Sequence, residues 1–209
     1  MTDAFALLNE PRRPWLEAEA LKQKFLPLSS AAHPDRTHNA PETEKQESNQ
    51  RYAELNAAYN TLREPRDRLL HLLELEQGAK PPDIQRIPPG TMDLFVEVGQ
   101  LCRDVDAFLI QRGNVTSPLL KVQMFERAME WTDQLQSLQQ RINARRDELT
   151  AELQQMNPVW ASAPPMGEPG RVAALPLERL EQLYRVFSYV ARWSEQIQER
   201  NVQLATGSF

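Results

Sequence analysis

Apolar residues recur along most of the chain at steps of three and four positions, the spacing that places side chains on one face of an α-helix. Prolines separate these periodic stretches, and because proline cannot donate the hydrogen bond of a helix interior, they mark helix boundaries. The pattern therefore predicts helices over Asp3–Asn9, from Trp15 to Leu28, from Pro41 to Leu62, from Pro65 to Gly78, over Thr91–Gln111, over Pro118–Met156 and over Leu177–Leu204.

Local signals refine these boundaries. Gly78 ends the fourth predicted helix, because glycine adopts the left-handed conformation of a helix C-cap without strain. Thr116 and Ser117 precede Pro118, so the next-to-last helix begins with capping residues and a proline in its first turn. Pro27 falls inside the second predicted helix, and we expect it to kink this helix or to end it early.

The last three predicted helices are amphipathic, and short or proline-rich segments connect them, which is typical of a three-helix bundle. The helix that starts at Pro118 is predicted to end near Met156, and a proline-rich loop over Asn157–Pro176 follows it. Cys102 is predicted to pack as a buried thiol. The aromatic residues predicted for the bundle core are Trp131, Tyr184, Phe187 and Trp193.

The segment KPPDIQRIPPG, at residues 80–90, divides the chain. Its prolines stiffen the backbone, so it is typical of a domain boundary or a semi-rigid linker. We therefore predict an N-terminal domain over residues 1–78, a linker over residues 79–89 and a helical domain over residues 90–209.

Composition supports an all-α fold and narrows the class of protein. Leu, Ala, Glu, Gln and Arg dominate, whereas the β-branched residues that favour strands are few. The net charge of −5 disfavours a nucleic-acid partner. The single cysteine, Cys102, excludes an internal disulfide and fits a reducing compartment. Since the sequence shows no secretory signal and no membrane span, we expect a cytoplasmic protein without a membrane partner.

His33, Pro34 and Asp35 lie between the second and third predicted helices. Proline fixes φ at about −65° and has no amide hydrogen, so the tripeptide forms a stiff turn. Such a turn can hold a histidine and an acid outward at the tip of a helical hairpin, and neither side chain belongs to an apolar stripe. The alternative is an ordinary interhelix turn in which Asp35 caps the next helix.

This arrangement resembles the J-domain family, which has a short first helix, an antiparallel pair of longer helices and a His-Pro-Asp loop that joins the pair. The matching segments are FALLNEP, LEAEALKQKF, HPDRTH and YAELNAAYNTLREPRDR. The run LREPRDRLLHLLELEQG is similar to the segment that follows the J-domain in the HscB family, the co-chaperones of iron–sulfur cluster assembly. The resemblance is specific over residues 3–78 and mainly architectural beyond residue 90.

The resemblance implies a protein that docks on a DnaK- or HscA-type chaperone and stimulates its ATP hydrolysis. Hydrolysis takes place in the partner, so we expect no enzymatic activity here, and no nucleotide-binding motif occurs. Glu17 and Glu19 offset the lysines of the second helix, which predicts weak docking or an adapted partner. The residues expected to bind the chaperone are His33, Pro34, Asp35, Lys22, Lys24 and Arg36.

In the HscB family the first helix of the C-terminal bundle binds the iron–sulfur scaffold protein through an apolar and acidic face. Phe95 and Val96 suit such a face, whereas Gln100 and Arg103 replace expected acids. The residues expected to bind this client are Phe95, Val96, Gly99, Gln100 and Arg103. The alternatives are that this helix only packs in the bundle, that the client is a different protein, or that a degenerate J-like scaffolding protein no longer stimulates ATP hydrolysis.

A metal site is the remaining chemical possibility that the sequence raises. His33, His38 and Asp35 lie close together in the chain, but further ligands are not evident. The acidic residues lie mostly on polar helix faces, where a solvated surface is expected rather than acid–base chemistry. We therefore predict no metal and no cofactor.

Overall fold

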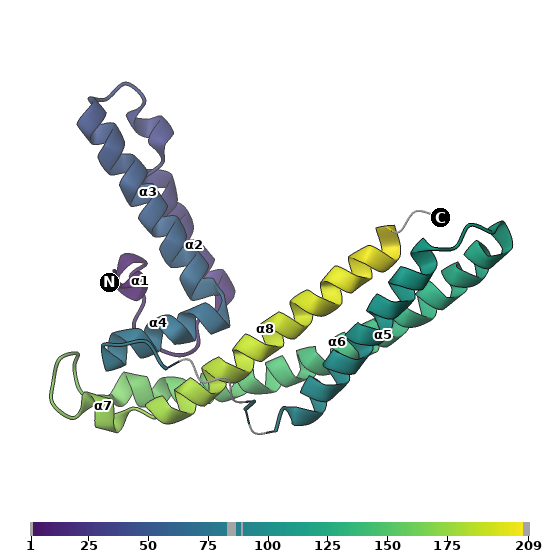
Figure 1. The fold of residues 1–209 in the computed structure, drawn as a ribbon. Coiled ribbons are helices and arrows are strands. Elements are labelled where there is room, and N and C mark those ends of the chain that lie inside the picture. The colour runs from purple at the N-terminus through teal and green to yellow at the C-terminus, as the bar shows by residue number, and fades with distance from the viewer. Residues whose placement is uncertain (1, 83–86, 89, 207–209) are drawn as a thin grey trace. The chain divides into compact units, whose positions relative to one another are not determined.

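The computed structural model describes residues 2–82, 87, 88 and 90–206, and these residues form helices and loops without a strand. This confirms the predicted fold class, all-α with a J-domain hairpin followed by a helical bundle. Figure 1 shows the elements α1 (Ala4–Leu7), α2 (Ala18–Ala31), the 3-10 turn η1 (Pro34–Thr37), α3 (Glu42–Arg63), α4 (Pro65–Gln77), α5 (Met92–Gly113), α6 (Pro118–Ser162), α7 (Arg171–Ala174) and α8 (Leu177–Thr206).

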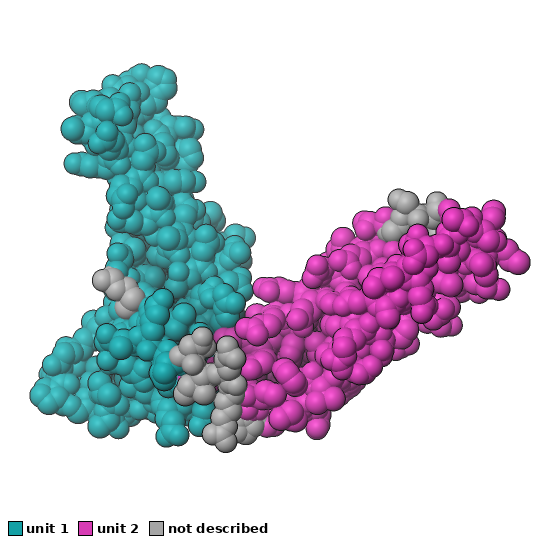
Figure 2. Space-filling view, viewed as in Figure 1, with its two compact units in different colours: residues 1–83, 150–184 teal, residues 84–149, 185–209 magenta. Residues whose placement is uncertain are grey.

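The chain forms two compact units, which Figure 2 colours separately. Unit 1 comprises Met1–Asp83 and Thr150–Tyr184, and unit 2 comprises Ile84–Leu149 and Arg185–Phe209. The helices α6 and α8 therefore each contribute one part to each unit. The predicted division into 1–78, 79–89 and 90–209 stays a prediction, and residues 83–86, 89 and 207–209 lie outside the described residues.

The antiparallel pair α2 and α3 dominates the N-terminal part of unit 1 (Figure 1). Leu21 of α2 and Leu55 of α3 are almost fully buried. The rings of Phe25 and Tyr59 stack between the helices at a centroid distance of 4.3 Å. The short α1 packs against α3 and buries Phe5 completely. Apolar side chains from three helices thus build one core, as their spacing predicts.

A buried arginine secures the end of this hairpin. Arg68 of α4 donates from Nε to the carbonyl oxygen of Pro14 at 2.8 Å and from Nη1 to that of Leu62 at 2.6 Å. Leu62 lies in the last turn of α3, where helix carbonyl groups have no partner within the helix. Burial lowers the pKa of Arg68 to about 10, so the guanidinium remains charged at neutral pH. Gly78 adopts φ 76° after α4, which confirms the predicted C-cap.

Residues 150–184 complete unit 1 through polar contacts with the N-terminal segment. The side-chain amide of Asn157 pairs with both backbone groups of Trp15, accepting from its N–H and donating to its carbonyl oxygen, each at 3.0 Å. Arg171 forms a bidentate pair with the Glu76 carboxylate at 2.7 and 2.8 Å. Both side chains of this pair are buried.

The end of α6 differs from the sequence prediction. The helix continues to Ser162 instead of ending near Met156, so Pro158 lies inside it and part of the predicted loop Asn157–Pro176 is helical. Proline removes one hydrogen bond from a helix interior. Trp160 lies in the added turn and is buried, and the burial of its large apolar surface favours continuation of the helix.

Unit 2 is a bundle of α5, most of α6 and most of α8 (Figure 1), as predicted. Cys102 is buried, and burial raises the pKa of its thiol, as expected for a packing residue. Phe187 and Trp193 are buried as predicted, whereas Trp131 is half-buried. The fully or almost fully buried core residues of this unit are Val98, Val105, Phe108, Leu135, Leu138, Ile142, Leu149 and Ile197.

Candidate functional site

The His-Pro-Asp loop lies at the tip of the α2–α3 hairpin. His33 caps η1, and its Nδ1 accepts a hydrogen bond from the Asp35 amide at 3.3 Å. Pro34 occupies the first position of η1, which sets the backbone of the turn. The His33 ring packs edge-on against Tyr52 of α3 at 5.1 Å. The loop is therefore shaped by its own residues and by one aromatic contact with the neighbouring helix.

The Asp35 carboxylate projects into solvent. Its side chain is 90% exposed, and Oδ2 lies 3.5 Å from Nδ1 of the neighbouring His33 ring. No side chain caps α3, which starts at Glu42 after Pro41, so Asp35 is not the cap of the next helix. The alternative of an ordinary turn with a capping acid is thus wrong. The turn leaves a carboxylate free to accept hydrogen bonds from a partner.

The basic residues expected to support docking are spread over the hairpin. Lys24 points back to the loop after α1, where its ammonium lies 2.8 Å from Glu10 Oε1 and donates to the Asn9 carbonyl at 3.1 Å. Lys22 lies 3.9 Å from Glu19. Arg36 in η1 is exposed, and it has no ion pair among the residues that the structure describes. Of these three, only Arg36 has no ion pair within the described residues, and weak docking stays a prediction.

Pro27 lies inside α2 without ending it. The helix continues to Ala31, and the Ala32 amide again donates to the Leu28 carbonyl at 3.1 Å. Of the two expected effects of Pro27, a kink or an early end, the early end is therefore wrong, and the kink stays a prediction. Proline removes one donor, but the stacked Phe25 and Tyr59 rings hold the preceding turn against α3. The last turn of α2 thus leads directly into His33.

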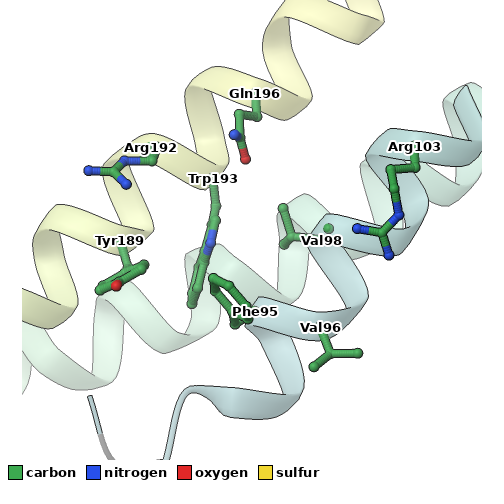
Figure 3. A pocket seen from close by; sticks show the side chains of 9 residues that line it. Phe95, Val96, Val98, Arg103, Tyr189, Arg192, Trp193 and Gln196 are labelled. Carbon is green, nitrogen blue, oxygen red and sulfur yellow. The ribbon is translucent and has the colours of Figure 1, made fainter. Parts of the chain in front are cut away.

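A second candidate site is a groove of about 380 Å³ on unit 2, between α5 and α8, shown in Figure 3. We call it the α5/α8 groove. Trp193 points from α8 toward α5 with the Phe95 ring beside it. Phe95 packs edge-on against Tyr189 at 6.3 Å, and Tyr189 contacts Trp193 at 5.7 Å. The residues that line it are Phe95, Val96, Val98, Gly99, Arg103, Tyr189, Arg192, Trp193 and Gln196.

The structure brings four of the five expected client-binding residues into this groove. Phe95 is 40% exposed and Val96 is 58% exposed, so apolar surface is accessible there. Gly99 lies beside Arg103, whose Nη1 would be 3.4 Å from a Cβ added at Gly99. Gln100 lies outside the groove lining, where its amide donates to Asp104 and its Oε1 accepts from Arg103 Nη2 at 2.7 Å.

Sequence reasoning missed the α8 wall of the groove. Trp193 was predicted only as bundle core, and Tyr189, Arg192 and Gln196 were assigned no role. The four-residue steps from Tyr189 to Trp193 and from Arg192 to Gln196 place them on neighbouring stripes of one helix surface. That spacing is a weak signal, because it does not say which helix lies opposite.

Metal-ligand clusters and membrane-spanning helices are absent from the described part of the chain. Nowhere in it do three or more His, Cys, Asp or Glu side chains gather as a metal ion requires. His38 turns its Nδ1 to the Asn39 side chain at 2.8 Å and does not meet His33. Among the same residues no helix is both long and apolar enough to cross a membrane.

The short α1, the antiparallel α2–α3 pair and the exposed His-Pro-Asp loop at its tip define a J-domain protein. No model of a known protein family matches the chain. A protein of Cupriavidus taiwanensis named co-chaperone protein HscB homolog is 31% identical over 154 residues, which cover 73% of this chain and 69% of that protein. The chain belongs to the HscB family of co-chaperones.

Two further comparisons bear on this family. A protein of the same name from Aromatoleum aromaticum is 38% identical over 73 residues, but the match spans only 41% of that protein's length. The crystal structure of human co-chaperone protein HscB is similar over 97% of this chain and 83% of that chain, with a TM-score of 0.62 and 18% identity. At that identity the likeness shows a shared fold.

Proposed function

We propose that this protein is a co-chaperone of iron–sulfur cluster assembly. It stimulates the ATPase of a DnaK- or HscA-type chaperone through His33 and Asp35, and it delivers the iron–sulfur scaffold protein through the α5 face. The observation that carries the proposal is the 90% exposed Asp35 carboxylate at the tip of a stiff turn. An exposed carboxylate can form a charge-assisted bidentate pair with an arginine of the chaperone. Family membership supports the same role.

The protein acts on its chaperone by shifting a conformational equilibrium. A ligand shifts such an equilibrium only by its difference in affinity for the two states, so the loop must bind the hydrolysing state more tightly. Pro34 and the His33 cap of η1 hold the loop before binding. Preorganisation of this kind reduces the ordering entropy that binding would otherwise lose.

Single-turnover ATP hydrolysis by the host's DnaK-type chaperones tests the loop. Wild-type protein is expected to accelerate hydrolysis, and His33→Gln and Asp35→Asn are expected to abolish the acceleration. His38→Gln is the matched control, because His38 is an exposed histidine close to the loop whose Nδ1 faces the Asn39 side chain. Equal stimulation by all four proteins would refute the loop's role.

Titration of the purified scaffold protein tests the client. Val96→Asp places a charge in the α5/α8 groove and is expected to weaken binding. Val122→Asp is the matched control, because Val122 of α6 is 59% exposed and Val96 is 58% exposed, but Val122 does not line the groove. Failure of the scaffold to bind at high micromolar concentration would point to a different client.

One observation favours a second candidate, a J-like scaffolding protein that no longer stimulates ATP hydrolysis. The ammonium of Lys24 is held by Glu10, whose side chain is 3% exposed, so α2 offers little free positive charge to the chaperone. Glu10→Gln weakens that hold and is expected to speed association with the chaperone, since exposed charges act mainly on the association rate. Absent stimulation by both wild type and Glu10→Gln would support this second candidate.

A further inference from the structure

The α5/α8 groove joins an apolar floor to a basic rim. Its floor consists of aromatic side chains, with the Phe95 ring beside Trp193 and Tyr189 next to them. Arg103 of α5 and Arg192 of α8 lie on either side of this floor (Figure 3). The lining residues include no carboxylate. A partner segment therefore meets aromatic rings in the centre and positive charge at the edge.

Neither rim arginine is neutralised within the described residues. Arg103 donates to the neutral Gln100 side chain, and Arg192 lies over the Tyr189 ring at 5.8 Å. Elsewhere in unit 2, Arg200 pairs with Asp106 at 2.7 Å. An arginine at a groove without a carboxylate keeps its charge available for a ligand, and its planar group is suited to bind a carboxylate with two hydrogen bonds.

We propose that the α5/α8 groove binds a client segment in which an apolar side chain is flanked by carboxylates. The apolar side chain packs on Phe95 and Tyr189, over the buried Trp193, and the carboxylates pair with Arg103 and Arg192. This proposal deepens the proposed function, since it takes the groove as the client site and specifies what the client must present. The proposal also gives α8 a role, because Tyr189 and Arg192 of α8 line the groove and contribute to the choice of partner together with α5.

Because its rim is basic, the groove prefers an acidic partner segment, whereas an acidic face would prefer a basic one. A basic client segment would meet two guanidinium groups without a counter-charge, and like charges at an interface reject a partner. The apolar floor alone would accept many hydrophobic segments, because apolar burial is non-directional. The two arginines therefore determine which apolar segments bind.

Selection from a random-peptide display library on the intact protein tests this preference. The counter-selection uses the Arg103→Glu/Arg192→Glu variant, in which two exposed side chains change charge. Peptides enriched on the wild type are expected to combine Asp or Glu with Leu, Ile or Phe, and to bind the single variant Arg192→Glu about tenfold more weakly. Enrichment of basic peptides, or no enrichment over the variant, would overturn the proposal.

Lys121→Glu is the matched control for these peptides. It makes the same change of charge on α6, outside the groove lining, and the peptides are expected to bind it with unchanged affinity. Equal loss on Lys121→Glu and Arg192→Glu would show attraction to net charge only and would also overturn the proposal. Wild type and Lys121→Glu are expected to stimulate the chaperone ATPase equally, so a failure of stimulation is recognised separately from a failure of the groove.

Discussion

The tip of the α2–α3 hairpin and the region around α4, which we call the base, are held by different kinds of interaction. At the tip, the Asp35 side chain is exposed to solvent, and the Asp35 amide donates to the half-buried His33 ring within the same turn. At the base, Arg68 and Arg171 are buried and bond to groups that lie far away in the chain. The difference separates two roles: the tip offers groups to a partner, whereas the base holds the hairpin in place. Substitutions at the two ends should therefore change different quantities.

The largest effect on stability is expected at the base, from Arg171→Met. This substitution leaves the Glu76 carboxylate, whose side chain is 2% exposed, without its bidentate partner. A buried charge that loses its partner destabilises a protein by about 3 kcal/mol. Urea unfolding measures this loss. The double variant Glu76→Gln/Arg171→Met is expected to recover part of it, and a single variant as stable as wild type would refute the role of the pair.

A smaller loss of stability is expected from Arg68→Met. The carbonyl groups of Pro14 and Leu62 lose their donor in a buried place, which destabilises the fold by about 2 kcal/mol. Arg63→Met is the control, because the Arg63 side chain is 52% exposed. If both variants unfold at the same urea concentration, Arg68 does not secure the base.

A pH-dependent contact at the base sharpens the comparison. His71 Nε2 accepts a hydrogen bond from the Ala4 amide at 3.0 Å, so this nitrogen must be unprotonated. Burial lowers the pKa of His71 below its ordinary 6.5, against the opposing effect of Asp3 and Glu74. The unfolded chain therefore binds this proton more readily, and stability is expected to be full above about pH 6.5 and to fall as the pH drops below it, through the folded pKa.

Urea midpoints measured over this pH range test the contact. His71→Gln keeps an acceptor near Ala4 but does not titrate, so its unfolding is expected to depend less on pH than that of the wild type. His38→Gln removes an exposed histidine and is expected to keep the wild-type dependence. The same slope in all three proteins would assign the pH dependence to other groups.

The smallest effect on stability is expected at the tip. Asp35→Asn removes an exposed charge that no buried group needs, so the free energy of unfolding is expected to change by less than about 0.5 kcal/mol. The same variant is expected to lose stimulation of the chaperone ATPase. A destabilisation as large as that of Arg68→Met would break the distinction between tip and base.

The tip could be predicted from the sequence because its determinants are adjacent. His33, Pro34 and Asp35 define the turn by themselves, and Gly78 sets the end of α4 by the one conformation that glycine favours there. The helices could be predicted from the spacing of apolar residues for the same reason, because this signal also lies within a few neighbouring residues.

The base and the groove could not be predicted in this way. Nothing in the local sequence of Asn157 indicates that it pairs with Trp15, and Glu76 gives no sign of Arg171. Pro158 predicts a helix end that tertiary packing overrides. The groove combines Phe95 with Tyr189 and Trp193, and their approach depends on how two helices meet, which spacing within either helix does not determine.

Unit 1 consists of two segments that are far apart in the chain, and this division sets the order in which its contacts form during synthesis. Its first segment ends at Asp83, but its second segment starts only at Thr150 and ends at Tyr184. A ribosome needs on the order of ten seconds to make the residues between Asp83 and Tyr184. Until then Trp15 lacks its partner Asn157, and Glu76 lacks Arg171. A nascent chain can therefore present its His-Pro-Asp loop before these two contacts at the base have formed.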